Sequence, residues 1–155
     1  GRRLERAGGG IALLQQLPEE HLLRSELETL LEVADSMLTY RARYLARVEI
    51  APVVDLLLAD DSNPRSVAFQ LVEIEDHLGR LPQPSELRAN QALRLAVRLS
   101  ADVRTADVEQ LCDDELSGLQ EFLATSQQQL WSLSDQIGHT WFTHALPQRS
   151  RGGWS

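Results

Sequence analysis

Arginine and tyrosine side chains concentrate in the segment between residues 35 and 65. Tyr40 and Tyr44 are one helical turn apart, and Arg41 falls on the same helical stripe as Leu38. A guanidinium on the apolar side of a helix needs a partner, because an unpaired buried charge strongly destabilises the fold. The segment therefore predicts either a structural polar network or a binding site.

An Asn63-Pro64 pair follows this helix and is itself followed by Arg65 and Ser66. Asparagine is a preferred N-cap and proline suits the first helical position, so the sequence predicts a helix that begins at Asn63. Free backbone N–H groups at a helix start, together with arginine side chains, suit phosphate or carboxylate. Two interpretations remain open: buried ion pairs that tie helices together, or a site for an anion or a peptide carboxylate.

We expect polar side chains from three helices to converge in one cluster. Arg41 is its expected centre, and Asp35, Asp55 and Glu5 are the candidate acids that would pair with it. The candidate members of the cluster are Glu5, Arg6, Asp35, Tyr40, Arg41, Arg43, Tyr44, Asn63 and Arg65.

The spacing of histidine, cysteine and carboxylate residues gives little support for a metal site or a nucleophile. Glu73 and His77 share a helical face, but a di-iron bundle requires Glu-x-x-His pairs on two helices. Cys112 precedes two aspartates and is expected to be a small core residue. We therefore expect no metal and no cofactor, and we lean towards a chain that is not an enzyme on its own.

The chain of 155 residues is acidic, with a net charge of −8, and all 15 of its basic residues are arginines. This charge disfavours nucleic-acid binding, which requires a positive field. The longest apolar run, residues 51–59, is interrupted by Asp55 and is too short to span a bilayer. No basic and apolar leader opens the chain, and the single Cys112 fits a reducing compartment. These features predict a cytoplasmic protein without nucleic-acid or membrane partners.

Apolar residues recur with helical spacing along the chain, and no segment shows sustained strand alternation. The pattern predicts an all-α fold: an antiparallel helical bundle of roughly six helices with a long C-terminal helix. One helical domain is expected over residues 1–145, with a disordered tail over residues 146–155. The expected helices cover residues 2–17, 25–47, 51–59, 63–79, 85–101, 105–111 and 114–144.

Three consecutive glycines, Gly8 to Gly10, interrupt the first of these helices. Each destabilises a helix by about 1 kcal/mol relative to alanine. Such a triplet is typical of a kink, a close helix crossing or a frayed helix end. A phosphate-binding loop is the alternative, but no strand precedes the glycines and no Lys-Ser/Thr pair follows them.

Several sequence blocks together resemble one known family. They are GRRLERA at residues 1–7, the D-S, T-Y-R and R-Y elements within residues 35–44, LLL at 56–58, NPRS at 63–66, H-L at 77–78, L-P at 81–82, S-D at 134–135, and Phe142-x-His144. The chain resembles the bacterial alpha-E domain family, whose all-helical members are named for a Glu-Arg pair, here Glu5-Arg6. The resemblance covers most of residues 1–144.

The resemblance implies an association rather than a reaction. Alpha-E domains occur beside, or fused to, circularly permuted ATP-grasp enzymes and transglutaminase-like cysteine proteases, which implies a system that makes and trims peptide or amide bonds. The chain is then expected to be a non-catalytic accessory or scaffold domain, with an ATP-grasp-type ligase as its partner in cis or in trans and a transglutaminase-like protein as a second partner. The alternative is a catalytic or ligand-binding domain that acts on a peptide or an anionic substrate through the Arg/Tyr/Glu cluster.

Alpha-E domains are also larger than this chain and carry an earlier Gly-Arg-x-Leu-Glu-Arg element. The chain is therefore expected to correspond to the C-terminal half of such a domain. The surface that the other half would cover is then expected to be apolar and open, and a homodimer through this surface is a further expectation.

Overall fold

Helices dominate the part of the chain that the structure describes. The computed structural model describes residues 1–19, 21–45, 47–82 and 89–142, and none of these residues lies in a β-strand. The all-α prediction is therefore confirmed. The helices are α1 Arg2–Leu14, α2 Arg24–Val33, α3 Met37–Arg43, α4 Ile50–Val54, the π-helix η1 Asp55–Ala59, α5 Val67–Arg80, α6 Ala89–Arg104, α7 Val108–Leu111, the 3-10 helix η2 Asp114–Leu116, α8 Ser117–Ile137 and the π-helix η3 Gly138–Phe142.

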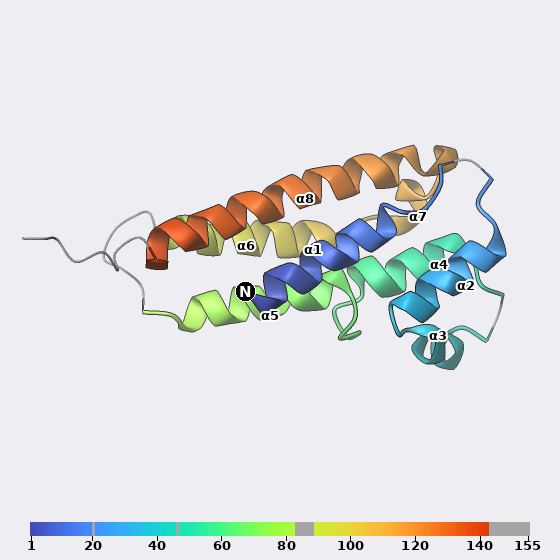
Figure 1. Cartoon of the computed structure of the whole chain (residues 1–155), viewed down its shortest axis with the longest axis horizontal. Coiled ribbons are helices and arrows are strands. Elements are labelled where there is room, and N and C mark those ends of the chain that lie inside the picture. Colours follow the sequence, from blue (N-terminus) through green and yellow to red (C-terminus); the bar gives the residue numbers. More distant parts are fainter. Residues whose placement is uncertain (20, 46, 83–88, 143–155) are drawn as a thin grey trace, which may run out of the picture.

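Four helices form the body of the molecule as an antiparallel bundle. Helix α1 packs against α5 and α8, and α6 packs against the same two helices, so the four helices close a ring. Each helix of this ring runs opposite to its two neighbours (Figure 1). Their inward faces build the core, in which the most deeply buried side chains include Ile11, Leu14, Leu71, Ala96, Leu99, Leu119, Leu123 and Leu133.

The long C-terminal helix is confirmed as α8, which η3 extends to Phe142. Apolar residues recur along α8 in a stripe with near-heptad spacing. This stripe faces the bundle interior, as is usual for an amphipathic helix. The single polar position of that stripe, Ser126, is only 2% exposed. The buried leucines of the stripe are Leu119, Leu123, Leu130 and Leu133.

The glycine triplet lies inside α1 and marks a close helix crossing. A Cβ atom at Gly10 would lie 2.9 Å from Cγ2 of Val67 in α5, and one at Gly8 would lie 3.6 Å from Cδ2 of Leu130 in α8. A Cβ atom at Gly9 would meet nothing within 4 Å. The missing side chain at Gly10 therefore lets α1 approach α5 more closely than a larger residue would allow.

The prediction of a single helix over residues 25–47 is wrong. The chain breaks between α2 and α3 at Asp35, whose φ of 52° is left-handed, a conformation that aspartate adopts more readily than most residues. The apolar stripe loses its register at this break, so that Leu38 is 83% exposed and Leu45 is 98% exposed. Tyr40 occupies the buried position of α3 instead.

The short buried helix expected at residues 51–59 is confirmed. Helix α4 and the π-helix η1 follow each other without a break from Ile50 to Ala59, and they contact α1, α2, α5, α6 and α7. Figure 1 shows this segment at one end of the bundle, where α4 packs against α2 and α7. Its buried side chains are Val53, Val54, Leu56, Leu57 and Leu58.

The described helices outnumber the expected ones, because residues 25–47 form two helices and short helical turns flank α8. Three expectations lie outside the described residues: a helix start at Ser85, a helix end at His144 and a disordered tail over residues 146–155. No helix in the described ranges has both the length and the apolar character that crossing a membrane requires.

Candidate functional site

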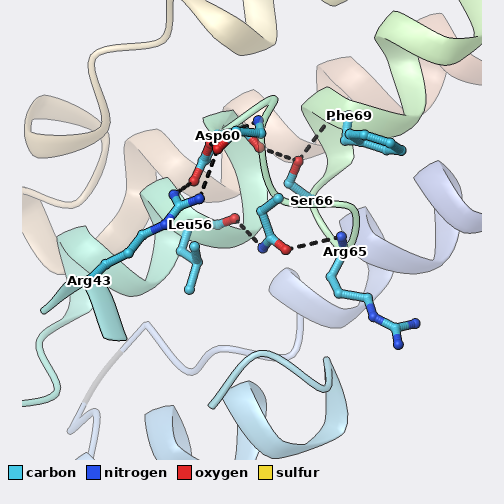
Figure 2. A network of polar contacts seen from close by, with 8 residues as sticks. Arg43, Leu56, Asp60, Arg65, Ser66 and Phe69 are labelled. Carbon is cyan, nitrogen blue, oxygen red and sulfur yellow. Dashed lines mark hydrogen bonds and ion pairs between the residues drawn. The ribbon is translucent and has the colours of Figure 1, made fainter. Parts of the chain in front are cut away.

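Residues 60–66 form a compact polar loop between η1 and α5, which we call the 60–66 loop (Figure 2). Oδ1 of Asp60 accepts hydrogen bonds from the backbone N–H of Ser62 at 2.9 Å and from its hydroxyl at 2.6 Å. The hydroxyl of Ser66 donates to the backbone carbonyl of Asp60 at 2.6 Å. Such bonds from short polar side chains to the backbone stabilise tight turns, so these side chains serve the turn itself.

Asn63 is 2% exposed and joins the 60–66 loop to the preceding helix. Its Nδ2 donates to the backbone carbonyl of Leu56 at 2.9 Å, and its Oδ1 accepts from the backbone N–H of Arg65 at 3.2 Å. The second bond is an Asx turn, which ends before α5 begins at Val67. Asn63 is therefore not the N-cap of this helix, and that expectation is wrong.

Ser66 caps α5 in its place. The Ser66 hydroxyl accepts a hydrogen bond from the backbone N–H of Phe69 at 3.0 Å, the usual arrangement for a serine N-cap. The side chain of Gln70 adds a bond from its Nε2 to the carbonyl of Pro64 at 2.7 Å. Because Ser66 satisfies one of the amides that an anion would use, the interpretation of this helix start as an anion site loses part of its basis.

Arg43 reaches from the end of α3 into the 60–66 loop (Figure 2). Its Nη2 donates to the hydroxyl of Ser62 at 2.8 Å, and its Nη1 forms an ion pair with Oδ2 of Asp60. The Asp60 side chain is only 13% exposed, which reduces the screening of this pair by water. The pair ties α3 to the end of η1, which agrees with the structural interpretation of the arginines.

Arg65 and Asp35 form a second ion pair, between Nη2 and Oδ2 at 2.5 Å. Their side chains are 57% and 76% exposed, so this pair is largely solvated. Exposed pairs of this kind typically contribute about 0–1 kcal/mol to stability. The structure thus brings together two predicted cluster members, although the Arg65 guanidinium extends away from the network of Figure 2.

Tyr40 and Tyr44 form the next part of the predicted cluster, with ring centroids 4.9 Å apart. The buried hydroxyl of Tyr40 donates to the backbone carbonyl of Arg47 at 3.1 Å and accepts from the backbone N–H of Glu49 at 3.2 Å. Both of its bonds hold the irregular segment between α3 and α4. Tyr40 is therefore a structural residue.

Tyr44, in contrast, lines a cavity of about 350 Å³ between α4, η1 and α7. Asp107 contributes a carboxylate, whose Oδ1 also accepts from the backbone N–H of Gln110 at 3.0 Å as the N-cap of α7. The described residues that line the cavity include three carboxylates and no arginine, so the charge of the cavity is opposite to the charge that an anion site requires. The lining residues are Tyr44, Ala51, Pro52, Asp55, Ala106, Asp107, Val108 and Glu109.

Burial raises the pKa of Tyr44 above its ordinary value of 10.0, and the carboxylate of Asp55 raises it further. The folded state favours the protonated hydroxyl of Tyr44. Its contribution to the free energy of unfolding is therefore fully present below about pH 10 and is lost as the pH rises through the folded-state pKa. We expect Asp55→Asn to lower the pKa of Tyr44, as followed by carbon NMR of the tyrosine rings. Asp61→Asn, outside the cavity, is the matched control. An unchanged Tyr44 titration in Asp55→Asn would contradict this account.

Three predicted members lie elsewhere. Glu5 and Arg6 are exposed on α1, and Arg41 is exposed on α3. The expected core position of Arg41 is wrong, because the break at Asp35 turns its side of α3 towards solvent. The predicted single cluster therefore divides into three groups. They are the 60–66 loop with Arg43, the exposed pair of Arg65 and Asp35, and the cavity lined by Tyr44, which we call the tyrosine cavity.

Sequence reasoning misses several residues of these groups. Asp60 and Ser62 were not among the predicted cluster residues, although the Asp-Asp-Ser triplet before Asn-Pro predicts a turn at this place. Asp107 and Glu109 carry no such signal, since only the fold brings α7 beside Tyr44. The acidic character of the cavity therefore emerges from the structure alone.

Cys112, half-buried after α7, has a raised pKa. Burial and the neighbouring Asp113 carboxylate raise the pKa of its thiol from 9.0 to about 11. Since the thiolate is the reactive form, and its nucleophilicity rises only in part with its pKa, we expect alkylation by iodoacetamide at about pH 8 to be about tenfold slower than for free cysteine. The rate should become that of free cysteine in urea. Fast alkylation of the folded chain would contradict the expected inert role.

The described residues contain no group of three or more His, Cys, Asp or Glu side chains placed to hold a metal ion. On the Glu73-His77 face, Nδ1 of His77 contacts the backbone carbonyl of Glu73. The Glu73 carboxylate pairs with Nη2 of Arg3 at 3.2 Å. These side chains therefore make local and interhelical contacts.

Comparison with known proteins identifies the family. A sequence model of the Alpha-E family, described as a predicted alpha-helical domain with a conserved ER motif, matches residues 1–142. An uncharacterised protein of Mycobacterium bovis is 29% identical over 128 residues, a match that covers 80% of this chain and 14% of that protein. An uncharacterised protein of Mycobacterium tuberculosis H37Rv matches with the same identity and coverage. The chain thus spans about 14% of the length of these relatives.

No solved structure matches the chain. The only Glu-Arg pair in the sequence is Glu5-Arg6, which lies exposed in the first two turns of α1. The family match covers nearly all of the described residues, and their all-helical fold agrees with the family description. The chain therefore belongs to the Alpha-E family.

Proposed function

We propose that this chain is a non-catalytic accessory or scaffold domain of a cytoplasmic system that makes and trims peptide or amide bonds. An ATP-grasp-type ligase is its partner, in the same polypeptide or as a separate protein, and a transglutaminase-like protein is the second partner. One observation carries the proposal: the arginines best suited to chemistry are used structurally or stand in solvent. Arg43 is paired with Asp60, Arg65 with Asp35, and Arg41 is exposed on α3.

The described fold agrees with an accessory domain whose partner carries the catalytic activity. Nucleotide chemistry of the ATP-grasp type is assigned to the partner, because the described residues form helices and no sheet. The mycobacterial relatives are much longer than this chain, which fits a helical module that works beside other domains.

The test is turnover with and without the partner. The purified chain is incubated with Mg-ATP and a mixture of amino acids and peptides, alone and with an ATP-grasp ligase from the same genome, and ADP and amide products are measured. We expect no turnover by the chain alone, and binding to the ligase or a change in its rate. Turnover by the chain alone that is lost in Tyr44→Phe or Glu5→Gln would overturn the accessory role.

The tyrosine cavity supports a second candidate function, the binding of an organic cation. Its three carboxylates, Asp55, Asp107 and Glu109, give it a negative charge, and Ala51 and Pro52 provide apolar walls. A cavity of this size with a few polar groups suits a small ligand or a single side chain. The complementary group is an amine or a guanidinium, such as the side chain of a basic peptide.

Calorimetry with arginine amide tests this candidate. We expect weak, salt-sensitive binding that Asp55→Asn abolishes and that Asp102→Asn, an exposed carboxylate on α6, leaves unchanged. Acetate is the anionic control and should not bind. Equal binding by both variants would show that the cavity is not the site.

A further inference from the structure

Helix α3 exposes apolar side chains on its outer side. Leu38 is 83% exposed, and Leu45, which follows the end of the helix, is 98% exposed. Arg41 and Ala42 are exposed between them. Leu38, Arg41 and Ala42 are spaced as i, i+3 and i+4 and therefore share one side of α3. We call these four residues the α3 face.

The inner side of the same helix is already occupied. Tyr40 is buried, the ring of Tyr44 packs against it at a tilt of 38°, and Met37 is half-buried against the core. Helix α3 packs chiefly on α2, at the edge of the bundle (Figure 1). The α3 face is therefore open to solvent, and the two leucines contribute nothing to the core of this chain.

The charge around the α3 face differs from that of the rest of the chain. Residues 36–48 contain three arginines and no carboxylate, whereas the whole chain has a net charge of −8. Arg43 is paired with Asp60, but Arg41 and Arg47 are exposed. Exposed Asp35 and Glu49 flank this segment, so the charge on the α3 face itself is that of Arg41.

We propose that the α3 face binds an acidic amphipathic helix of a partner protein. The apolar stripe of that helix would cover Leu38, Ala42 and Leu45, with the small Ala42 allowing close approach of the two helices. Carboxylates beside the stripe would pair with Arg41. This inference goes beyond the proposed function, because it concerns the recognition surface and does not depend on the ligase being the partner.

Other occupants fit the α3 face less well. In a symmetric pair the second copy would present the same α3 face, which offers Arg41 an arginine and no carboxylate. Binding in a lipid surface requires a longer amphipathic helix with a wide apolar face. Nucleic acid would be repelled by the net charge of −8.

The probe for the test is a fluorescent, amidated peptide of about 18 residues, with leucines at i, i+3, i+4 and i+7 and glutamates at most other positions. Binding is followed by anisotropy, and its location by backbone amide NMR of the folded chain. We expect saturable binding that weakens with added salt, with shifts centred on residues 38–45. A scrambled peptide of the same composition controls for charge alone.

Two independent variants should each weaken binding at least tenfold: the double variant Leu38→Ser/Leu45→Ser and the charge reversal Arg41→Glu. All three positions are exposed, so the fold should survive, which the helical circular dichroism signal would verify. The matched control on α6 is the double variant Val97→Ser/Arg94→Glu, which replaces an exposed valine and an exposed arginine. It should bind the peptide as the unchanged chain does.

Several results would overturn the proposal. They are equal binding of the scrambled peptide, unchanged affinity in both α3 variants, or NMR shifts outside residues 38–45. Concentration-dependent dimerisation that Leu38→Ser abolishes would assign the surface to a second copy. Binding to phosphatidylglycerol vesicles, without binding to the peptide, would assign it to a membrane surface.

Discussion

Replacing Asn63 by alanine is expected to lower the free energy of unfolding by about 2–3 kcal/mol, because it leaves buried backbone groups unpaired. The side chain is 2% exposed and bonds to the carbonyl of Leu56 and to the backbone N–H of Arg65. Both partners remain buried or partly buried after the substitution and lose these bonds. Urea denaturation followed by circular dichroism measures the difference.

Arg65→Ala is the matched control for this prediction, since it lies two residues away and removes only a solvated ion pair. It should change the free energy of unfolding by less than about 1 kcal/mol. If Asn63→Ala were as mild as Arg65→Ala, the 60–66 loop would not be held by Asn63, and the structural interpretation of this polar group would be wrong.

The second large effect is expected at the crossing of α1 and α5. Gly10→Leu introduces a Cβ atom 2.9 Å from Cγ2 of Val67, a residue with no exposed surface. Overpacking of this kind typically destabilises a protein by about 1–3 kcal/mol, and leucine adds further atoms beyond the Cβ. We expect a loss of about 3 kcal/mol in urea denaturation, because neither helix can move away without opening the core.

Gly9→Leu provides a control, for which we expect a change of opposite sign in the free energy of unfolding. Nothing lies within 4 Å of a Cβ atom at Gly9, so the substitution meets open space. Leucine also has the higher helix propensity, by somewhat less than 1 kcal/mol. The variant should therefore be slightly more stable than the unchanged chain. Equal destabilisation by both variants would mean that the triplet is needed for a reason other than the crossing.

The bundle itself could be predicted from the sequence because its signals are repetitive. Leu119, Leu123, Leu130 and Leu133 share one helical stripe, and such a stripe has a single favourable placement, facing a core. The short buried helix at residues 51–59 was equally clear from its apolar run. These signals are local, and tertiary packing reinforces them.

The break at Asp35 could not be predicted in the same way. Residues 25–47 keep a continuous helical pattern, and the left-handed backbone at Asp35 leaves no mark in it. The consequence for the site was large, since the break between α2 and α3 moved Arg41 from a predicted core position to the surface. A single backbone angle thus decided which residues face inward.

The helix start after the 60–66 loop shows a different limit of sequence reasoning. Asn63 and Ser66 are both good N-caps by residue type. The Asn63 Nδ2 donates to the carbonyl of Leu56, and its Oδ1 accepts from the N–H of Arg65 in a turn before α5 begins, whereas the Ser66 hydroxyl accepts from the N–H of Phe69. The position of the turn relative to η1, which decides between the two caps, is a tertiary property. It cannot be read from the composition of the turn.

The position of α1 in the bundle has a consequence for synthesis on the ribosome. Helix α1 packs between α5 and α8, and the side chain of Gln120 bonds to the backbone carbonyl of Leu17, 103 positions earlier in the chain. Since α1 is made before α5 and α8, it acquires its second neighbour only when α8 has been made. Until then the α8-facing side of α1 remains uncovered, and nascent chains that stop before α8 should be targets for chaperones.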